Sequence, residues 1–390
     1  MSMKPRIYLD FNATMPLVPA ARAAIAVALD TPGNPSSIHA DGRRARDLVE
    51  RARNQVAALV GAPRERLVFT SGGTEANALA IRMLASAAEH RGLPRIAATT
   101  ALEHPSLRGA IAGCGDAGWQ VRWLTVAGDA VIDDVGSDAV GVIAISAVNH
   151  ELGTLATMAG ASAGIETVVA WARARGALIH IDAVQAAGKL ELAPLTRLAD
   201  TVAVSGHKIG GPQGAGALVV ADAIDHSDPY EPPTRVVAGH QERGRRPGTE
   251  NMLGIVGFGA AAAAIDLAQW GTVAALGDQL EAGLRLIGGV RIHGDRGVRV
   301  GGTINAGFEG ALGESIVVAL DLAGVSVSTG AACTSGSIQP SPVLLGLGLS
   351  AAQAREAVRF SLGPTTTAGE VDEVLAILPG IVETARRHRR

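Results

Sequence analysis

Short apolar runs alternate with longer segments of helical periodicity over residues 64–220 of the chain. The apolar runs have the length of buried strands, and segments such as residues 75–90 and 161–175 have the length of helices. Alternation of this kind predicts an α/β fold with a mostly parallel sheet, whose ligands bind beyond the carboxyl ends of the strands. The expected strands are residues 67–69, 96–98, 121–126, 140–147, 177–181 and 201–204.

The pattern changes near residue 251, where a long helical stretch is followed by a mixture of strand and helix signals. Residues 301–308 come next, followed by an expected helix at residues 313–323, an expected strand at residues 325–328 and an expected helix from Ala368 onward. The short apolar run at residues 7–9 is expected to join them. We therefore predict a large cofactor-binding domain over residues 16–255 and a smaller α+β domain made of residues 1–15 and 256–390.

Composition narrows the class of protein. Of the 390 residues, 47% are hydrophobic and 18% are charged, so the chain can bury a large core. A net charge of −3 does not favour binding to nucleic acid or to a membrane surface. The first ten residues lack the apolar region of a secretory signal, and no run approaches the ~18 uninterrupted apolar residues of a membrane span. We expect a cytoplasmic enzyme, and we predict no metal site.

Two scarce residue types matter for chemistry. Cys114 and Cys333 are too few for a disulfide framework in a chain of this length, so free thiols are expected. The only lysines are Lys4, Lys189 and Lys208, and arginine supplies almost all other positive charge. Because lysine forms Schiff bases and arginine does not, a lysine inside a motif is a candidate for covalent catalysis.

A glycine-rich stretch at residues 70–77 follows an expected strand and begins an expected helix. Small residues such as Gly73 and Thr74 let backbone N–H groups approach an anion, and the helix N-terminus adds a favourable potential. The stretch predicts either a phosphate site or an ordinary helix start capped by Ser71 or Thr74.

A carboxylate and a lysine stand at the ends of two later strands. Asp182 follows the run at residues 177–181, where a carboxylate is costly unless it is paired, faces a site or caps the next turn. The protonated ring nitrogen of pyridoxal phosphate would be a suitable partner. Lys208 follows the run at residues 201–204 and can form a Schiff base with an aldehyde cofactor. Ser205 and His207 beside it are candidate phosphate donors.

Two further polar residues lie near expected strands. His104 follows the run at residues 96–98, and its imidazole could stack on a flat cofactor ring or move protons, although most histidines do neither. Arg359 lies in an apolar strand, where its guanidinium is costly unless it meets an anion. That anion would be a substrate carboxylate or the partner in an internal salt bridge.

The two cysteines differ in their surroundings. Cys333 lies among the small residues 328–337, which cannot anchor themselves in a core, so we expect a mobile loop that carries the thiol to a substrate and then to another protein. A buried structural cysteine is the alternative, and the small neighbours disfavour it. Cys114 has no polar neighbour in the sequence, and we interpret it as structural.

Taken together, these residues resemble the cysteine desulfurases of the nitrogen-fixation and iron–sulfur-assembly type. Those enzymes belong to the class V aminotransferase group of fold-type I pyridoxal-phosphate enzymes. The resemblance extends from Tyr8 to about Gly363. The residues that carry it are 33–37, 71–77, 103–104, 148–149, the pair Asp182 and Gln185, 205–208, 241–251 and 333–337.

The resemblance implies a role for each matching position. Lys208 would hold pyridoxal 5'-phosphate, Asp182 would pair with its ring nitrogen, Gln185 would bond its phenolate oxygen, and His104 would stack on the ring and help to move the α-proton. Cys333 would take sulfur from L-cysteine as a persulfide, leave alanine, and deliver the sulfur to an acceptor protein. The phosphate would be bound by Gly73, Thr74, Ser205 and His207, with Thr249 from the other subunit of a homodimer, and the substrate carboxylate by Arg359, Asn34 and Asn149, the last also contacting the cofactor.

The sequence departs from the family pattern in places. Phe11 stands where the family often has Asn, His150 stands where a second Asn is usual, and residues 154–158 lack the common Gln-Pro pair.

Two alternative functions are compatible with the same residues. One is another class V reaction, such as transamination or selenocysteine lysis, which does not always need Cys333. The other is a catalytically slack scaffold for iron–sulfur assembly, which would have no use for the pair Asp182 and Lys208.

Overall fold

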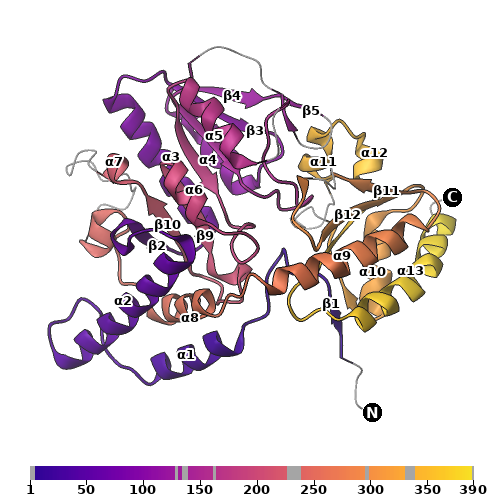
Figure 1. Ribbon diagram of the computed structural model, residues 1–390, viewed down its shortest axis with the longest axis horizontal. Coiled ribbons are helices and arrows are strands. Elements are labelled where there is room, and N and C mark those ends of the chain that lie inside the picture. The colour runs from indigo at the N-terminus through magenta and orange to yellow at the C-terminus, as the bar shows by residue number, and fades with distance from the viewer. Residues whose placement is uncertain are drawn as a thin grey trace.

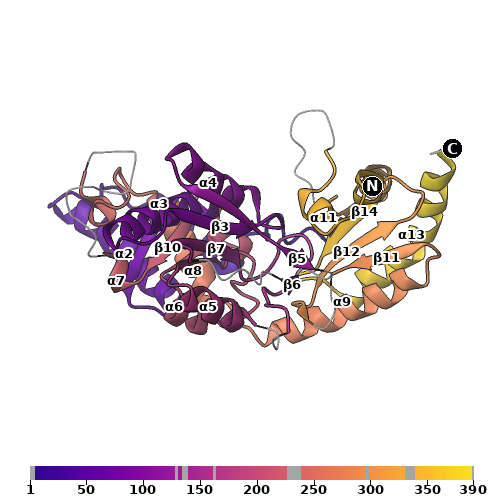
Figure 2. The same cartoon turned by 90° about the horizontal axis from the view of Figure 1, so that it is seen from above.

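The protein consists of two lobes that lie side by side, a larger one with a wide sheet and a smaller one with a narrow sheet (Figures 1 and 2). This is a computed structural model, and it describes residues 5–127, 131–133, 139–160, 164–225, 239–294, 298–329 and 339–388. Each lobe has its own hydrophobic core.

Seven strands of the described residues form the large sheet, in the order β2-β10-β9-β8-β7-β3-β4. Only β10 is antiparallel to its neighbours, so the sheet is mostly parallel, as the alternation of strands and helices predicted. Most of its strands are fully buried, which is typical of a parallel sheet with helices on both faces. The strands are β2 (Leu67–Thr70), β3 (Ile96–Thr100), β4 (Gln120–Leu124), β7 (Val142–Ser146), β8 (Leu178–Asp182), β9 (Thr201–Ser205) and β10 (Gly216–Val220).

Helices cover both faces of this sheet (Figure 2). One face packs against α3 (Gly73–His90) and α4 (Pro105–Asp116). The other packs against α5 (Ile165–Ala174), α6 (Ala193–Leu198) and α8 (Met252–Ala263), and α8 in turn packs against α1 (Pro19–Leu29) and α2 (Ala40–Val60). No helix of the described residues is long and apolar enough to cross a membrane. Shorter elements of this lobe are β5 (Val126–Ala127), β6 (Val131–Ile132), α7 (Asp222–Asp225) and the 3-10 helices η1 (Arg64–Arg66), η2 (Gly206–Lys208) and η3 (Gln241–Gly244).

The small lobe is built on an antiparallel sheet in the order β11-β12-β14. The chain's first strand lies here too, because β1 (Ile7–Tyr8) pairs with β13 (Val325–Ser326), and Ile7 and Leu9 join this lobe's core. Residues 7–9 therefore join the small sheet region as expected, while the exact domain boundaries stay a prediction. The remaining elements are β11 (Val290–His293), β12 (Thr303–Phe308), β14 (Ala357–Ser361), α9 (Gln269–Arg285), α10 (Gly313–Leu322), α11 (Pro342–Gly346), α12 (Ala351–Ala354) and α13 (Ala368–His388).

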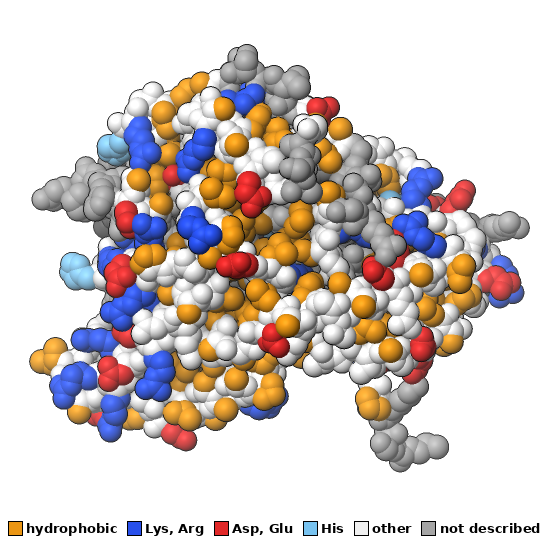
Figure 3. Space-filling model, in the orientation of Figure 1, with side chains coloured by type: hydrophobic (Ala, Val, Ile, Leu, Met, Phe, Trp, Pro, Cys, Tyr) orange, Lys and Arg blue, Asp and Glu red, His pale blue; other side chains and the backbone are white. Residues whose placement is uncertain are grey.

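Charged side chains of both signs are mixed over the face of the molecule seen in Figure 3. Hydrophobic side chains also reach the surface over α1, at the bottom of that view, where Val27 is 61% exposed and Leu29 is 66% exposed.

Candidate active site

A cavity of about 530 Å³ lies where the large sheet meets the small lobe. Residues at or just after the carboxyl ends of β3, β7, β8 and β9 line it, which is where a mostly parallel sheet is expected to bind its ligands. The small lobe contributes Arg359 and Ser328, and the N-terminal segment contributes Asn12. Among its lining residues are nine of the predicted site residues, Gly73, Thr74, His104, Asp182, Gln185, Ser205, His207, Lys208 and Arg359.

Lys208 is the last residue of the 3-10 helix that follows β9, and it lines the cavity. Its Nζ donates to the backbone carbonyls of Asn12 at 2.5 Å and Ala13 at 2.9 Å. Burial and then nearby Arg359 lower the pKa of Lys208 to about 8, with Asp10 and Asp182 acting in the opposite direction. The amine is therefore a better nucleophile near neutral pH than a surface lysine.

Asp182 ends β8, and its carboxylate is fixed from two sides. Oδ2 accepts a hydrogen bond from Asn77 Nδ2 at 2.7 Å, and Oδ1 accepts one from the backbone of Val184 at 2.9 Å. Asn77 is held in turn by His180, whose Nε2 lies 2.9 Å from Asn77 Oδ1. Burial lowers the pKa of His180 to about 3, so this imidazole is neutral. Since each Asp182 oxygen accepts one bond here, each has lone-pair capacity left for a donor in the cavity.

The same asparagine connects Asp182 to His104. The second N–H of Asn77 donates to Ser106 Oγ at 3.0 Å, and Ser106 Oγ lies 2.8 Å from His104 Nδ1. The backbone N–H of Ser106 also donates to His104 Nδ1, at 3.1 Å. Because a backbone N–H can only donate, Nδ1 is an acceptor and the neutral ring carries its proton on Nε2. Burial lowers the pKa of His104, Asp182 raises it, and Lys208 lowers it.

A cradle for an anion lies at the other end of the cavity, where α3 begins. Ser205 Oγ is buried there and has no hydrogen-bond partner. Any Cβ on Gly73 would lie 2.7 Å from Val184 Cγ2, so a side chain at residue 73 would not fit without movement. Burial and then Lys208 lower the pKa of His207 to about 4. An unpartnered hydroxyl beside a helix N-terminus suits a phosphate group.

Arg359 enters from β14, and its guanidinium already has two partners. Nη2 donates to Asp10 Oδ1 at 2.8 Å, and Nη1 donates to the carbonyl of His150 at 3.1 Å. The internal salt bridge considered from the sequence is therefore present. The Nε of Arg359 is buried without a partner, so at least this donor remains for a ligand.

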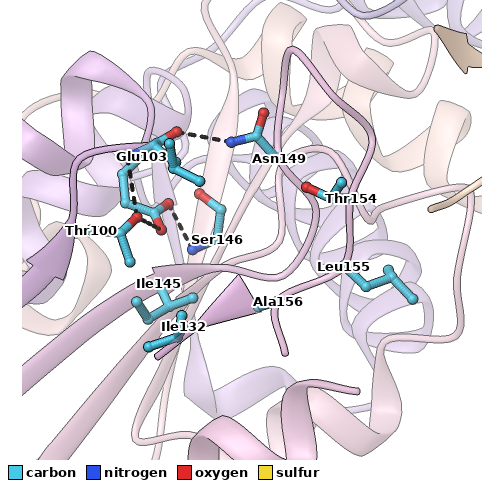
Figure 4. Close-up of a pocket in the computed structure, with 10 residues that line it drawn as sticks. Thr100, Glu103, Ile132, Ile145, Ser146, Asn149, Thr154, Leu155 and Ala156 are labelled. Atoms are coloured by element: carbon cyan, nitrogen blue, oxygen red, sulfur yellow. Dashed lines mark hydrogen bonds between the residues drawn. The ribbon is translucent and has the colours of Figure 1, made fainter. Parts of the chain in front are cut away.

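Asn149 lies beside the main cavity, in a smaller pocket shown in Figure 4. Its Nδ2 donates to the carbonyl of Leu102 at 2.8 Å, and its Oδ1 accepts from the backbone of Glu151 and Leu152. The side chain thus shapes the turn after β7. Since the amide nitrogen carries a second N–H, the predicted contacts of Asn149 with cofactor and substrate stay a prediction.

Two other predicted residues, Asn34 and Thr249, are not among the residues that line the cavity. Asn34 is exposed, and its side chain accepts from the backbone of Ser36 at 2.8 Å. Thr249 is exposed as well. Cys333 lies outside the described residues. Cys114 is buried on α4, where burial raises the pKa of its thiol to about 11, in agreement with a structural role.

Two residues at the site were assigned no catalytic or binding role from the sequence. His150 lines the cavity and meets His104 edge-on, with ring centroids 5.1 Å apart, and its buried Nδ1 has no partner. Burial holds the pKa of His150 well below its ordinary value, and His104 adds to this. Glu103 is buried below the cavity with its pKa raised to about 7 by burial, and it accepts bonds from Thr100 and Ser146 (Figure 4). Only the departure from the family pattern at His150 could have drawn attention to it.

Comparisons with known proteins identify the relatives of this chain. Residues 7–374 match the aminotransferase class-V family. The chain belongs to this family. A cysteine desulfurase of Trichormus azollae is 39% identical over 97% of this chain and 94% of that protein, and one of Cereibacter sphaeroides is 38% identical over 98% and 97%. A solved NifS-like protein superposes with a TM-score of 0.85 at 28% identity, covering 97% of this chain and all of that one.

These relatives confirm the fold-type I architecture, the resemblance to the cysteine desulfurases and the dependence on pyridoxal phosphate that the sequence predicted. Another solved relative, described as SspA in complex with cysteine, has a TM-score of 0.75 at 29% identity and covers 93% of this chain and all of its own. The cavity residues fit this cofactor, since an amine, a carboxylate and an unpartnered hydroxyl at a helix start match its aldehyde, ring nitrogen and phosphate.

Proposed function

We propose that this protein is a cysteine desulfurase that converts L-cysteine to L-alanine and carries the sulfur on Cys333. The observation that carries the proposal is the arrangement of three groups around one cavity. The Lys208 amine, the Asp182 carboxylate and the unpartnered Ser205 hydroxyl lie at the ends of adjacent strands. The cysteine desulfurase relatives support the same reaction.

Bound pyridoxal phosphate supplies a protonated ring that accepts the electron pair released at the substrate α-carbon. The protein's residues do the rest. Asp182 keeps the ring nitrogen protonated, and Asn77 holds that carboxylate in one orientation. The Lys208 amine, whose pKa is lowered, would hold the cofactor and would also take the α-proton and return it.

Sulfur transfer requires a second nucleophile. The Cys333 thiolate attacks the sulfur of the substrate, so that a new S–S bond forms while the carbon–sulfur bond breaks and its electron pair goes to carbon. A proton then reaches that carbon, and alanine leaves. The substrate carbon is reduced and the transferred sulfur is oxidised, so the step needs no outside oxidant. The thiolate is the reactive form, and a base or a cation near it would favour it.

A borohydride experiment tests the cofactor assignment. Protein incubated with pyridoxal phosphate and reduced should gain one pyridoxyl group, and peptide mass analysis should find it on Lys208. Lys208→Arg is the matched control, because it keeps the charge and cannot form the covalent bond. Label on Lys189 or on no lysine would contradict the assignment. An assay of alanine and sulfide release from L-cysteine distinguishes a desulfurase from a transaminase or selenocysteine lyase.

We also propose that the active form is a homodimer in which Thr249 completes the phosphate site of the other subunit. Thr249 is exposed and apart from its own cavity, and α1 presents apolar side chains to solvent. Thr249→Ala should weaken cofactor binding, whereas Thr384→Ala, at an exposed position on α13, should not. A protein that sediments as a monomer at full cofactor occupancy would contradict the proposal.

The persulfide on Cys333 has to be discharged, so we propose an acceptor protein in the cytoplasm, with iron–sulfur cluster assembly as the destination. A reducing compartment suits a thiol that must return to its free form after each turnover. Radioactive sulfur from cysteine should pass from Cys333 to an added iron–sulfur scaffold protein without appearing first as free sulfide. Label that appears only as sulfide would contradict protein-to-protein transfer.

A further inference from the structure

Lys189 is a lysine at the site that the proposed reaction leaves without a role. It follows β8 by seven residues, is partly buried, and lies over the ring of Trp270 with its Nζ 5.3 Å from the ring centre. It lines a second cavity of about 220 Å³, and Lys208 lines both cavities. Burial, followed by the charges of Lys208 and Arg359, lowers the pKa of Lys189 to about 7.

The Nζ of Lys189 donates to two side-chain oxygens. It lies 3.0 Å from Gln185 Oε1 and 2.8 Å from Asn12 Oδ1. Gln185 is 6% exposed, and its Nε2 donates to the backbone carbonyl of Asn12 at 2.9 Å. An amide nitrogen carries two N–H groups, so this arrangement occupies one of them and leaves the other for the main cavity, which Gln185 lines.

The donor on Lys189 determines which way round the Gln185 amide lies. In the opposite orientation, the amide nitrogen would face the Lys189 amine and the amide oxygen would face the carbonyl of Asn12. Two hydrogen bonds would become a donor against a donor and an acceptor against an acceptor, at a buried position where unpaired groups are costly. A neutral Lys189 amine still carries two N–H groups, enough for both of its acceptors, so the preference persists on either side of neutral pH.

We infer that Lys189 is a positioning residue, which fixes the Gln185 amide with an N–H toward the cavity so that it donates to the ring oxygen of bound pyridoxal phosphate. The inference rests on the proposed function, because it needs that cofactor in the main cavity. The Asn12 carbonyl that accepts from Gln185 also accepts from Lys208 at 2.5 Å. Through its hydrogen bond to the Asn12 side chain, Lys189 therefore also stabilises the residue whose backbone carbonyl accepts from the Lys208 amine.

A double-mutant cycle tests this inference. Lys189→Met keeps the length of the side chain and removes the donor, Gln185→Ala removes the amide, and the third variant carries both changes. The dissociation constant of apoprotein for pyridoxal phosphate and the absorbance maximum of the bound cofactor are measured for each. If Lys189 acts through Gln185, each single change should weaken binding roughly tenfold, the value of one lost hydrogen bond to a charged or buried group. The double variant should be no weaker than Gln185→Ala, and all three should shift the absorbance maximum alike.

Two more variants keep the test decisive. Lys189→Arg retains donors, and the second cavity offers room for the larger group, so its binding should stay near that of the wild type. Trp270→Phe changes the other side of Lys189 and should leave the dissociation constant unchanged. Losses that multiply in the double variant to roughly a hundredfold, or a Lys189→Arg protein as weak as Lys189→Met, would overturn this inference alone. Wild-type protein that binds no pyridoxal phosphate would overturn the proposed function and this inference with it.

Discussion

Asn77 donates a hydrogen bond to Asp182 across 2.7 Å, at a place where Asn77 is fully buried and Asp182 is 6% exposed. The two residues come from α3 and β8, which are far apart in the sequence. The same amide connects to His180 and to Ser106, the partner of His104. One buried side chain thus orients both the carboxylate expected to pair with the ring nitrogen of the cofactor and the imidazole expected to stack on its ring.

Replacing Asn77 should therefore affect stability and cofactor binding together. Asn77→Leu leaves His180 Nε2 and Asp182 Oδ2 without partners in a buried place, so the free energy of unfolding should fall by about 1–3 kcal/mol. Cofactor binding should weaken as well, because Asp182 loses its fixed orientation. Thermal unfolding and titration with pyridoxal phosphate measure the two effects. The exposed Asn54→Leu is the control, and an Asn77→Leu protein that matches it in both measurements would contradict the network.

Arg359 is expected to bind the substrate carboxylate while it is held by Asp10. Arg359→Ala should raise the Michaelis constant for L-cysteine and cost about 2–5 kcal/mol of binding, as when one partner of a buried charge pair is removed. Arg359→Lys should rescue little, since a single ammonium cannot reach Asp10, the His150 carbonyl and a ligand in the geometry of a guanidinium. An unchanged Michaelis constant in Arg359→Ala would make the residue purely structural.

The lowered pKa of Lys189 should appear in the pH dependence of stability. The folded apoprotein loses the Lys189 proton near pH 7, whereas the ordinary value for the unfolded chain is 10.5. Between these values the unfolded chain binds more protons, so the free energy of unfolding should rise with pH and reach its full gain above 10.5. Denaturant unfolding of the wild type and of Lys189→Met between pH 6.5 and 10 measures this pH dependence of the free energy of unfolding. The wild type should gain stability relative to the variant as the pH rises, and a flat or falling difference would contradict the assignment.

The two cysteines should react differently with alkylating agents. Burial and the raised pKa of the Cys114 thiol, about 11, make it a poor nucleophile in the folded protein. One thiol should therefore be alkylated rapidly at pH 8 in the wild type, and none in Cys333→Ser until the protein unfolds. Intact-mass analysis over time counts the modified thiols. Rapid labelling of Cys114 in the folded Cys333→Ser protein would contradict its structural role.

The sequence predicted those parts of the site that depend on where strands end. Asp182 and Lys208 could be predicted because polar residues directly after buried strands must lie at the carboxyl edge of a parallel sheet. The runs at residues 7–9 and 325–328 were both expected in the small domain, but their pairing with each other appears only in the structure.

Side-chain hydrogen bonds between distant segments could not be predicted in this way. Asn149 and His150 are adjacent in the sequence, and only the geometry of their turn directs the Asn149 amide to the backbone and His150 to the cavity. The salt bridge of Arg359 with Asp10 was an open alternative, but its partner lies 349 positions away. The scarcity of lysine was a usable signal for Lys189, yet nothing in the sequence indicated its contact with Gln185.

The most direct test of the proposed reaction is alanine release from L-cysteine by Cys333→Ser, with Cys114→Ser as the matched control. A persulfide mechanism requires a nucleophilic thiol that receives the sulfur, and Lys208 and His104 can move the α-proton but cannot carry sulfur away. The Cys333→Ser protein should bind cofactor and cysteine and release almost no alanine, while Cys114→Ser should match the wild type. In the wild type, one turnover without acceptor should add one sulfur to Cys333, removable by reductant. Alanine release at the wild-type rate by Cys333→Ser would contradict the account and favour a direct lyase or transaminase reaction.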